Sequence, residues 1–157
     1  MCLGNICRSP LAQGVLEHRA AAMDLSDDLR IASCGTGSWH IGSPPDPRSI
    51  AVARKHGVSL NSRGRQVNPG ADFANFDLIV PMDRANERDL IRLGCPNTKM
   101  ALCLAFVEPD AESLAQRHGY EVPDPYHDGD EGFDTVFRLI DSSAKGLLAS
   151  ILSGRGS

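Results

Sequence analysis

The sequence lacks the features that would place it at a membrane, on nucleic acid or around a metal ion. No apolar run reaches the ~18 residues that a spanning helix needs, so we expect no membrane association. Acidic residues outnumber basic ones by 20 to 16, the formal net charge is −4, and no basic cluster offers a nucleic-acid surface. Paired cysteine or histidine spacings typical of metal sites are also absent, and we expect neither metal nor cofactor.

Internal repeats, low-complexity tracts and a disulfide framework are missing as well. The five cysteines are odd in number and follow no framework spacing, which is typical of reduced thiols in the cytoplasm. The chain has 157 residues, of which 41% are hydrophobic, enough for one domain with its own core. We therefore expect a single cytoplasmic domain over residues 1–157.

A loop-forming motif stands at the start of the chain, where five residues separate Cys2 from Arg8. Such a loop can turn successive N–H groups inward as an anion-binding nest, and glycine and asparagine tolerate the positive φ that it requires. Pro10 at the first position of a helix and Ser9 as its cap would open the nest onto a positive helix N-terminus. That field favours a phosphate dianion and a thiolate at Cys2, while Arg8 can grip two phosphate oxygens. The predicted phosphate-binding residues are Leu3, Gly4, Asn5, Ile6, Cys7, Arg8 and Ser9.

Beyond this loop, helical and strand patterns alternate along the chain. Helices are predicted at 11–22, from Pro47 to a stop at Gly57, from the cap Asp83 to Leu93 with Gly94 as the stop, and around 136–151. Strands are predicted at 30–33, 77–80 and 100–104, whereas 61–75 and 109–130 are predicted to be irregular, with Phe73 and Phe76 anchoring the first of these to the core. The alternation predicts an α/β fold with a parallel sheet covered by helices on both faces. In such sheets ligands bind beyond the carboxyl ends of the strands, where the loop of residues 2–9 is expected.

The loop resembles the active-site loop of the low-molecular-weight protein tyrosine phosphatases, and further motifs in the same order extend the resemblance over essentially the whole chain. The resemblance implies a three-layer sandwich with a four-stranded parallel sheet. It also implies hydrolysis of phosphotyrosine in proteins through a phosphocysteine intermediate, with inorganic phosphate or vanadate as inhibitors. The additional motifs are Ser33-Cys34-Gly35-Thr36, Trp39-His40, Asp46-x-Arg48, Arg65-Gln66, Phe76-Asp77, Met82-Asp83-x-x-Asn86 and Asp124-Pro125-Tyr126.

The family resemblance also implies an apolar strand just before the loop, in the middle of the sheet, whereas this chain starts one residue before Cys2. Loss of about five buried residues at roughly 1.5–3 kcal/mol each removes on the order of 10 kcal/mol, comparable with the ~5–15 kcal/mol that stabilises a whole domain. We therefore expect that Met1 is a misplaced start, that the domain is truncated before its active-site loop, and that the natural chain is longer.

In a phosphocysteine mechanism the tyrosine oxygen that leaves phosphorus needs a proton, and the water that later attacks phosphorus needs a base. One carboxylic acid can serve both steps. The chain has 20 acidic residues, so residue type alone does not identify the general acid. Asp124 is distinguished because the following proline stiffens the turn that carries it. The resemblance identifies Asp124 as the general acid and Ile6, Trp39 and Tyr126 as the walls of a substrate slot, with core packing as the alternative for Trp39.

The resemblance assigns supporting roles to other side chains around the loop. Ser33 is expected to hydrogen-bond Asn5, and Ser9 to donate to the Cys2 thiolate. Cys7 either packs beneath the loop or forms a reversible disulfide with Cys2. The remaining cysteines, Cys34, Cys95 and Cys103, are predicted to be buried small hydrophobic residues.

Three other functions remain open. Arsenate reduction on the same loop needs two further mobile thiols, but Cys103 falls in a predicted buried strand and Cys95 lies eight residues before it. Phosphoarginine hydrolysis is associated with threonine at the position of Ile6, whose apolar side chain better suits a phenyl ring. An inactive phosphate-binding product of truncation is the third, and only the missing strand argues for it.

Overall fold

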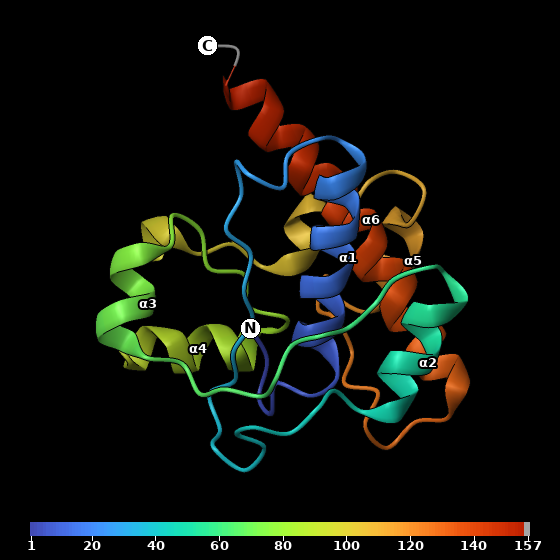
Figure 1. Cartoon of the computed structure of the whole chain (residues 1–157), viewed down its shortest axis with the longest axis horizontal. Helices are drawn as coiled ribbons and strands as arrows, with labels where there is room; N and C mark the ends of the chain where they lie inside the picture. The colour runs from blue at the N-terminus through green and yellow to red at the C-terminus, as the bar shows by residue number, and fades with distance from the viewer. Residues whose placement is uncertain (156–157) are drawn as a thin grey trace.

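The structure is a computed structural model that describes residues 1–155, and Figure 1 shows their arrangement. Helix α1 packs along the C-terminal helix α6, and α2 packs on both of them. Helices α3 and α4 lie on the opposite side of the chain start (Figure 1). The helical elements in order are α1 (Arg8–Ala22), α2 (Pro47–Lys55), α3 (Pro69–Asn75), α4 (Arg84–Arg92), the 3₁₀ turns η1 (Asn97–Lys99) and η2 (Cys103–Phe106), α5 (Glu112–Arg117) and α6 (Asp130–Arg155).

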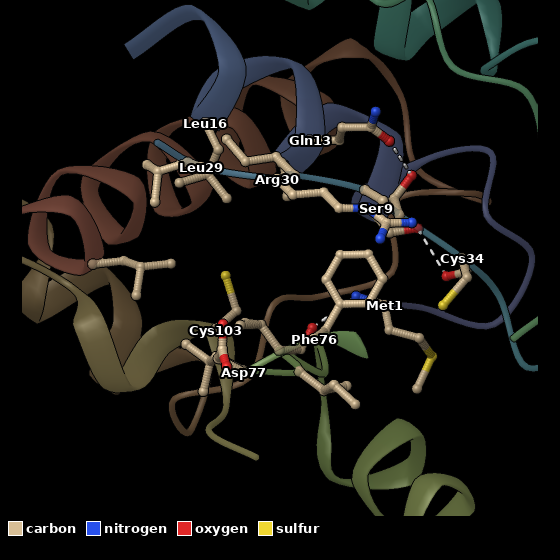
Figure 2. A pocket seen from close by; sticks show the side chains of 18 of the residues that line it. Met1, Ser9, Gln13, Leu16, Leu29, Arg30, Cys34, Phe76, Asp77 and Cys103 are labelled. Carbon is tan, nitrogen blue, oxygen red and sulfur yellow. Dashed lines mark hydrogen bonds between the residues drawn. The ribbon is translucent and has the colours of Figure 1, made fainter. Parts of the chain in front are cut away.

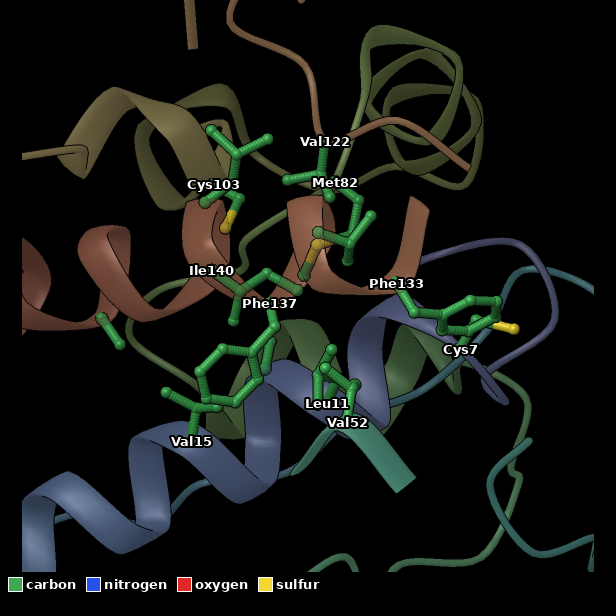
Figure 3. Close-up of a cluster of buried hydrophobic side chains, with 14 of the residues drawn as sticks. Cys7, Leu11, Val15, Val52, Met82, Cys103, Val122, Phe133, Phe137 and Ile140 are labelled. Atoms are coloured by element: carbon green, nitrogen blue, oxygen red, sulfur yellow. The ribbon is translucent and has the colours of Figure 1, made fainter. Parts of the chain in front are cut away.

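The main core lies between α1, α2 and α6, and Figure 3 shows its side chains. Leu11 and Val15 of α1 and Phe133 and Ile140 of α6 belong to this core, and none of the four is more than 1% exposed. Burial of each such side chain contributes about 1.5–3 kcal/mol. Because Cys2 and Cys7 belong to the same cluster, the core directly supports the loop at the start of the chain.

Helix α1 begins three residues earlier than predicted, and the prediction of Ser9 as its cap was wrong. The N-cap is Cys7, which forms no side-chain capping bond, and Ser9 and Pro10 already lie in the first turn. The positive φ of Asn5 (55°) turns the chain so sharply that the helix can start directly after the loop. The Ser9 hydroxyl is therefore directed into the loop instead of capping the helix.

Two other helix boundaries are confirmed. The Asp46 side chain accepts a hydrogen bond from the backbone N–H of Arg48, and Asp83 accepts one from Asn86, so both residues cap the helices that follow them. Gly57 and Gly94 follow the ends of these helices with φ of 73° and 89°, a conformation in which a side chain is strained.

Two helices fall in segments that were predicted to be irregular. Asn68 caps α3 in the segment 61–75, with Pro69 at its first position, and α5 interrupts the segment 109–130. The starting signal of α3 is thus the same aspartate- or asparagine-proline pattern that announces α2. Its Phe73 is partly buried against a second, smaller cluster, in agreement with the anchoring role predicted for it.

The predicted strands at 30–33, 77–80 and 100–104 are not continuous strands in the part of the chain that the structure describes, and the last of them runs into η2. Parallel pairing is confined to isolated bridges that join Cys2 to Gly35, Gly35 to Gln66, and Ile79 to Met100. A cavity of about 290 Å³ separates segments 29–34 and 76–80, so neither can pair with the other (Figure 2). Within residues 1–155, the predicted sheet is therefore represented by these three isolated bridges alone.

No helix within residues 1–155 has both the length and the apolar character needed to cross a bilayer.

Candidate active site

The loop of residues 2–7 wraps in front of the N-terminus of α1, and Asn5 holds it closed. Its side-chain amide donates to the hydroxyls of Ser9 (2.8 Å) and Ser33 (3.0 Å), and its carbonyl oxygen accepts the backbone N–H of Arg65 at 2.9 Å. The contact predicted between Asn5 and Ser33 is therefore present. Because Asn5 is 2% exposed, these bonds join three segments of the chain with little competition from water.

The backbone N–H groups of this loop point to an anion. Within residues 1–155, the N–H groups of residues 3–8 donate to no other group of the chain. A run of backbone N–H groups without partners in a tight loop forms an anion-binding nest. Helix α1 adds the partial positive charge of its N-terminus. This part of the molecule has the form of a phosphate cradle.

The Cys2 sulfur lies against this cradle and contacts the Ser9 hydroxyl, with 3.0 Å between Sγ and Oγ. Cys2 is 3% exposed, and the loop and the main core enclose it. The predicted proximity of Ser9 to the sulfur is present, although Ser9 reaches it from the first turn of α1 and not as a cap.

Arg8 is buried and is held by groups that are distant in the sequence. One guanidinium nitrogen donates to Asp83 at 2.6 Å and to the carbonyl oxygen of Val122 at 2.9 Å, and the other lies 3.4 Å from Asp124. Asp83 was predicted only as a helix cap, but it has two roles. One carboxylate oxygen caps α4 and the other orients Arg8. The motif Met82-Asp83-x-x-Asn86 was the only sequence signal for this second role.

Asp124 lies at the mouth of the site with about half of its side chain exposed. One of its carboxylate oxygens accepts the backbone N–H of Tyr126 at 3.1 Å, which stiffens the turn, and the other faces Arg8. A carboxyl group in this position is close enough to the cradle to exchange a proton with a group bound there.

One pocket of about 320 Å³ brings together most of the predicted site residues, although they come from three separate segments, 2–8, 39–40 and 124–127. Trp39 is 72% exposed beside this pocket, which excludes core packing for it, and Tyr126 is 45% exposed. Two histidines that were not predicted as site residues also border the pocket: His40, from the Trp39-His40 motif, and His127, which follows Tyr126. The lining residues are Cys2, Leu3, Gly4, Ile6, Cys7, Arg8, Trp39, His40, Asp124, Tyr126 and His127.

The remaining cysteines are buried and unpaired with one another. Burial, followed by the nearby Asp46 carboxylate, raises the pKa of the Cys7 thiol to about 12, and burial raises that of Cys103 to about 11. Cys34 and Cys95 are buried as well, in agreement with the prediction that they pack as small hydrophobic side chains. Cys103 lies in η2 and not in a strand, yet it is as enclosed as predicted. Within residues 1–155, no group of three potential ligands is placed to hold a metal ion.

Comparison with known proteins places this geometry in a family. The family model described as "Low molecular weight phosphotyrosine protein phosphatase" matches residues 1–155. The phosphatase of this name from Schizosaccharomyces pombe is 38% identical over 146 residues, covering 91% of this chain and 89% of the relative. That from Sus scrofa is 36% identical over 151 residues, covering 96% and 92%.

Solved structures agree with this match. A protein tyrosine phosphatase from Entamoeba histolytica superposes with a TM-score of 0.87 at 32% identity, covering 98% of this chain and 95% of that one. YfkJ from Bacillus subtilis gives a TM-score of 0.85 at 37% identity, covering 98% and 92%. The α/β fold of these neighbours is therefore the fold of this chain, which belongs to the low molecular weight phosphotyrosine protein phosphatases, a family of cysteine-dependent hydrolases.

Proposed function

We propose that this chain hydrolyses phosphotyrosine in proteins, with Cys2, Arg8 and Asp124 as its catalytic residues. The observation that carries the proposal is the run of N–H groups from residue 3 to residue 8 without partners in residues 1–155, in a loop that lines the same pocket as Cys2. These donors and the Arg8 guanidinium neutralise the non-bridging oxygens of a bound phosphoryl group as charge develops on them.

In the first step the Cys2 thiolate attacks phosphorus, an S–P bond forms, and the bond from phosphorus to the tyrosine oxygen breaks. Asp124 gives its proton to that oxygen, which leaves as a neutral phenol. In the second step Asp124 takes a proton from water, the oxygen of that water attacks phosphorus, and the sulfur leaves as a thiolate. The Ser9 hydroxyl, 3.0 Å from the sulfur, stabilises the thiolate as it leaves.

The substrate slot favours an aromatic leaving group. Ile6 provides an apolar floor, and the exposed rings of Trp39 and Tyr126 stand beside the same pocket, where they can stack on a phenyl ring. Phosphoarginine would need a hydroxyl to recognise its guanidinium, and Ile6 has none. Comparison of kcat/KM on the two phosphoamino acids tests this preference, and Ile6→Thr is expected to shift the ratio towards phosphoarginine.

The catalytic assignments are tested by three measurements on a phosphotyrosyl peptide. Cys2→Ser is expected to abolish turnover but still to bind inorganic phosphate. Asp124→Ala is expected to lower the rate by about 10²–10⁴-fold, the usual contribution of a general acid. Orthovanadate is expected to inhibit competitively. Full activity of Asp124→Ala would overturn the acid assignment while leaving that of Cys2 intact.

We also propose that the cavity beside Met1 is the position of a central strand in a four-stranded parallel sheet, and that the domain starts before this strand. Met1 donates to Val80 and accepts from Met82, while Cys2 donates to Cys34, so the chain start already pairs on both sides. Along the cavity walls, within residues 1–155, the N–H groups of residues 32, 34, 78 and 80 have no partner. A strand continuing backwards from Met1 in this register would meet them.

This fold proposal is tested by comparing the 157-residue chain with one extended at its N-terminus by five alternating apolar residues. The extended chain is expected to unfold at a higher urea concentration and to hydrolyse p-nitrophenyl phosphate faster. Mass spectrometry of the native N-terminus provides the second test. Equal stability of the two chains, or an intact and active native protein that begins at Met1 or Cys2, would refute the proposal.

For Cys7 we propose a redox role. Hydrogen peroxide oxidises the Cys2 thiolate to a sulfenic acid, and Cys7 then attacks that sulfur to form a disulfide and release water. Because the pKa of Cys7 is about 12, the disulfide is expected to form faster as the pH rises from 7 to 9. Without this disulfide, excess peroxide oxidises the sulfenic acid further to a sulfinic acid, which dithiothreitol does not reduce. Inactivation by excess peroxide is therefore expected to be reversed by dithiothreitol in the parent and much less in Cys7→Ser. We also propose that the protein works in the cytoplasm, because all five of its cysteines are free and free thiols are typical of a reducing compartment.

A further inference from the structure

Arg48, near the start of α2, contacts two parts of the site that are otherwise separate. Two of its guanidinium nitrogens donate to the Asp46 carboxylate, at 3.0 and 2.9 Å. The third donates to the backbone carbonyl oxygens of Tyr126 (3.0 Å) and Asp128 (3.3 Å), which belong to the turn that carries Asp124. A single planar group therefore joins the cap of α2 to the acid-bearing turn.

The α2 side of this connection is anchored to the phosphate cradle. The backbone N–H of Asp46 donates to the carbonyl oxygen of Ile6 at 2.8 Å, and the Ser49 hydroxyl donates to that of Cys7 at 3.4 Å. The Asp46 side chain is only 9% exposed, so its carboxylate offers Arg48 a fixed partner. Movement of Arg48 relative to the cradle is therefore restricted by bonds on both sides of its backbone.

Two aromatic rings limit the guanidinium further. It lies 4.6 Å from the ring centroid of Phe133, a side chain of α6 that is 1% exposed, and 5.6 Å from that of Tyr126. The buried ring gives Arg48 a rigid support, and cation–π attraction holds the guanidinium over it. The acid-bearing turn, by contrast, has exposed side chains from residue 126 to residue 130 and few other attachments.

From these contacts we infer that Arg48 is a positioning residue that holds the turn of residues 124–128 at a fixed distance from the phosphate cradle. It thereby aims Asp124 at the leaving oxygen. This inference rests on the proposed function, because it assigns Arg48 a role through the acid. The hydrogen bonds of the Arg48 guanidinium go to Asp46, Tyr126 and Asp128 and not to the cradle, so its loss is expected to affect catalysis more than phosphate binding.

The test compares kcat/KM for phenyl phosphate, whose leaving group needs a proton, with that for p-nitrophenyl phosphate, whose leaving group scarcely needs one. Arg48→Met is expected to lower the first by about 10²-fold, the usual loss for a catalytic group displaced by 1 Å. The second value and inhibition by orthovanadate are expected to change little. The control is Arg54→Met on the exposed side of the same helix, expected to change neither. Equal losses on both substrates would overturn the inference, because they would indicate general disruption of the site.

A double-mutant cycle with Asp124→Ala separates the inference from the proposed function. If Arg48 acts through Asp124, Arg48→Met causes no further loss on phenyl phosphate once Asp124 is alanine, and additive losses contradict the inference. If Asp124→Ala alone has no effect, the acid assignment itself fails. Arg48→Lys keeps the charge but not the planar fork, and is expected to show the same selective loss to a smaller degree. That variant provides the same comparison should the methionine variant fail to fold.

Discussion

Alanine at position 35 is expected to disable the site by moving the phosphate cradle. Gly35 bridges Cys2 on one side and Gln66 on the other, directly behind the loop. A Cβ at this position would lie 2.6 Å from the carbonyl oxygen of Leu3 and 3.1 Å from the backbone nitrogen of Asn5, whereas ordinary contacts begin at 3.4 Å. Both neighbours are backbone atoms of the cradle, so the loop must shift by most of an ångström.

A shift of this size predicts two effects of different magnitude. Catalysis on p-nitrophenyl phosphate is expected to fall by about 10²-fold in kcat/KM, as for other displacements of about 1 Å, and inhibition by inorganic phosphate is expected to weaken. The free energy of unfolding is expected to fall by only about 1–3 kcal/mol, the usual cost of overpacking. Steady-state kinetics and urea unfolding measure the two quantities on the same preparation.

Gly57→Ala provides the matched control. Gly57 has φ 73° with nothing within 4 Å of an added Cβ, so alanine costs stability by backbone strain of about 1–2 kcal/mol but contacts nothing. Gly57 lies after α2, away from the cradle. The kcat/KM of the Gly57→Ala variant is therefore expected to match that of the parent. Activity of Gly35→Ala within threefold of the parent, at a similar loss of stability, would refute the steric reasoning.

Three further predictions concern stability and thiol chemistry. Hydrogen bonds from Arg48 hold the pKa of Asp46 below its ordinary value, so its contribution to stability is present above the unfolded-state pKa of about 3.9 and is lost as the pH falls through the folded-state pKa. Urea unfolding is therefore expected to find Asp46→Asn less stable than the parent at pH 6, with a smaller difference at pH 3; a constant difference would contradict this. Leu11→Ala, at a fully buried position, is expected to lower the unfolding free energy by about 2–5 kcal/mol, and a loss below 1 kcal/mol would show that the core is loosely packed. Peptide mass mapping is expected to find Cys7 and Cys103 unmodified by iodoacetamide at pH 7.5 in the native protein and modified after denaturation, because burial raises the pKa of both thiols.

The cradle and the helix boundaries could be predicted because their signals are local. Asp46 and Asp83 cap helices through N–H groups only two and three residues away, and the tight turn at Asn5 depends on that residue's own φ. Helix α3 was missed although Asn68 and Pro69 carry a local signal of the same kind. The segment 100–104 illustrates the opposite problem, because an apolar run fits a strand and a buried 3₁₀ turn equally well.

The contacts that orient the catalytic groups could not be read from spacing. Arg8 meets Asp83 across 75 residues and Val122 across 114, and Arg48 reaches Tyr126 across 78. No pattern along the chain records which of 20 acidic residues faces a given arginine, since that choice depends on how the helices pack. The rim histidines His40 and His127 belong to the same class of residues, which only the folded chain brings to the site.

By itself, then, the sequence determined the loop of N–H donors next to Cys2, the proposed nucleophile, and the ends of several helices, because each arises from torsions and hydrogen bonds within a few residues. Only the tertiary structure decided how Arg8 is held, where Asp124 lies and which rings border the slot, because these depend on the packing of α1, α2 and α6 around one core. The sheet shows the same division. Its segments have strand-like sequences, but a strand is stable only with a hydrogen-bonded neighbour, and a cavity separates segments 29–34 and 76–80.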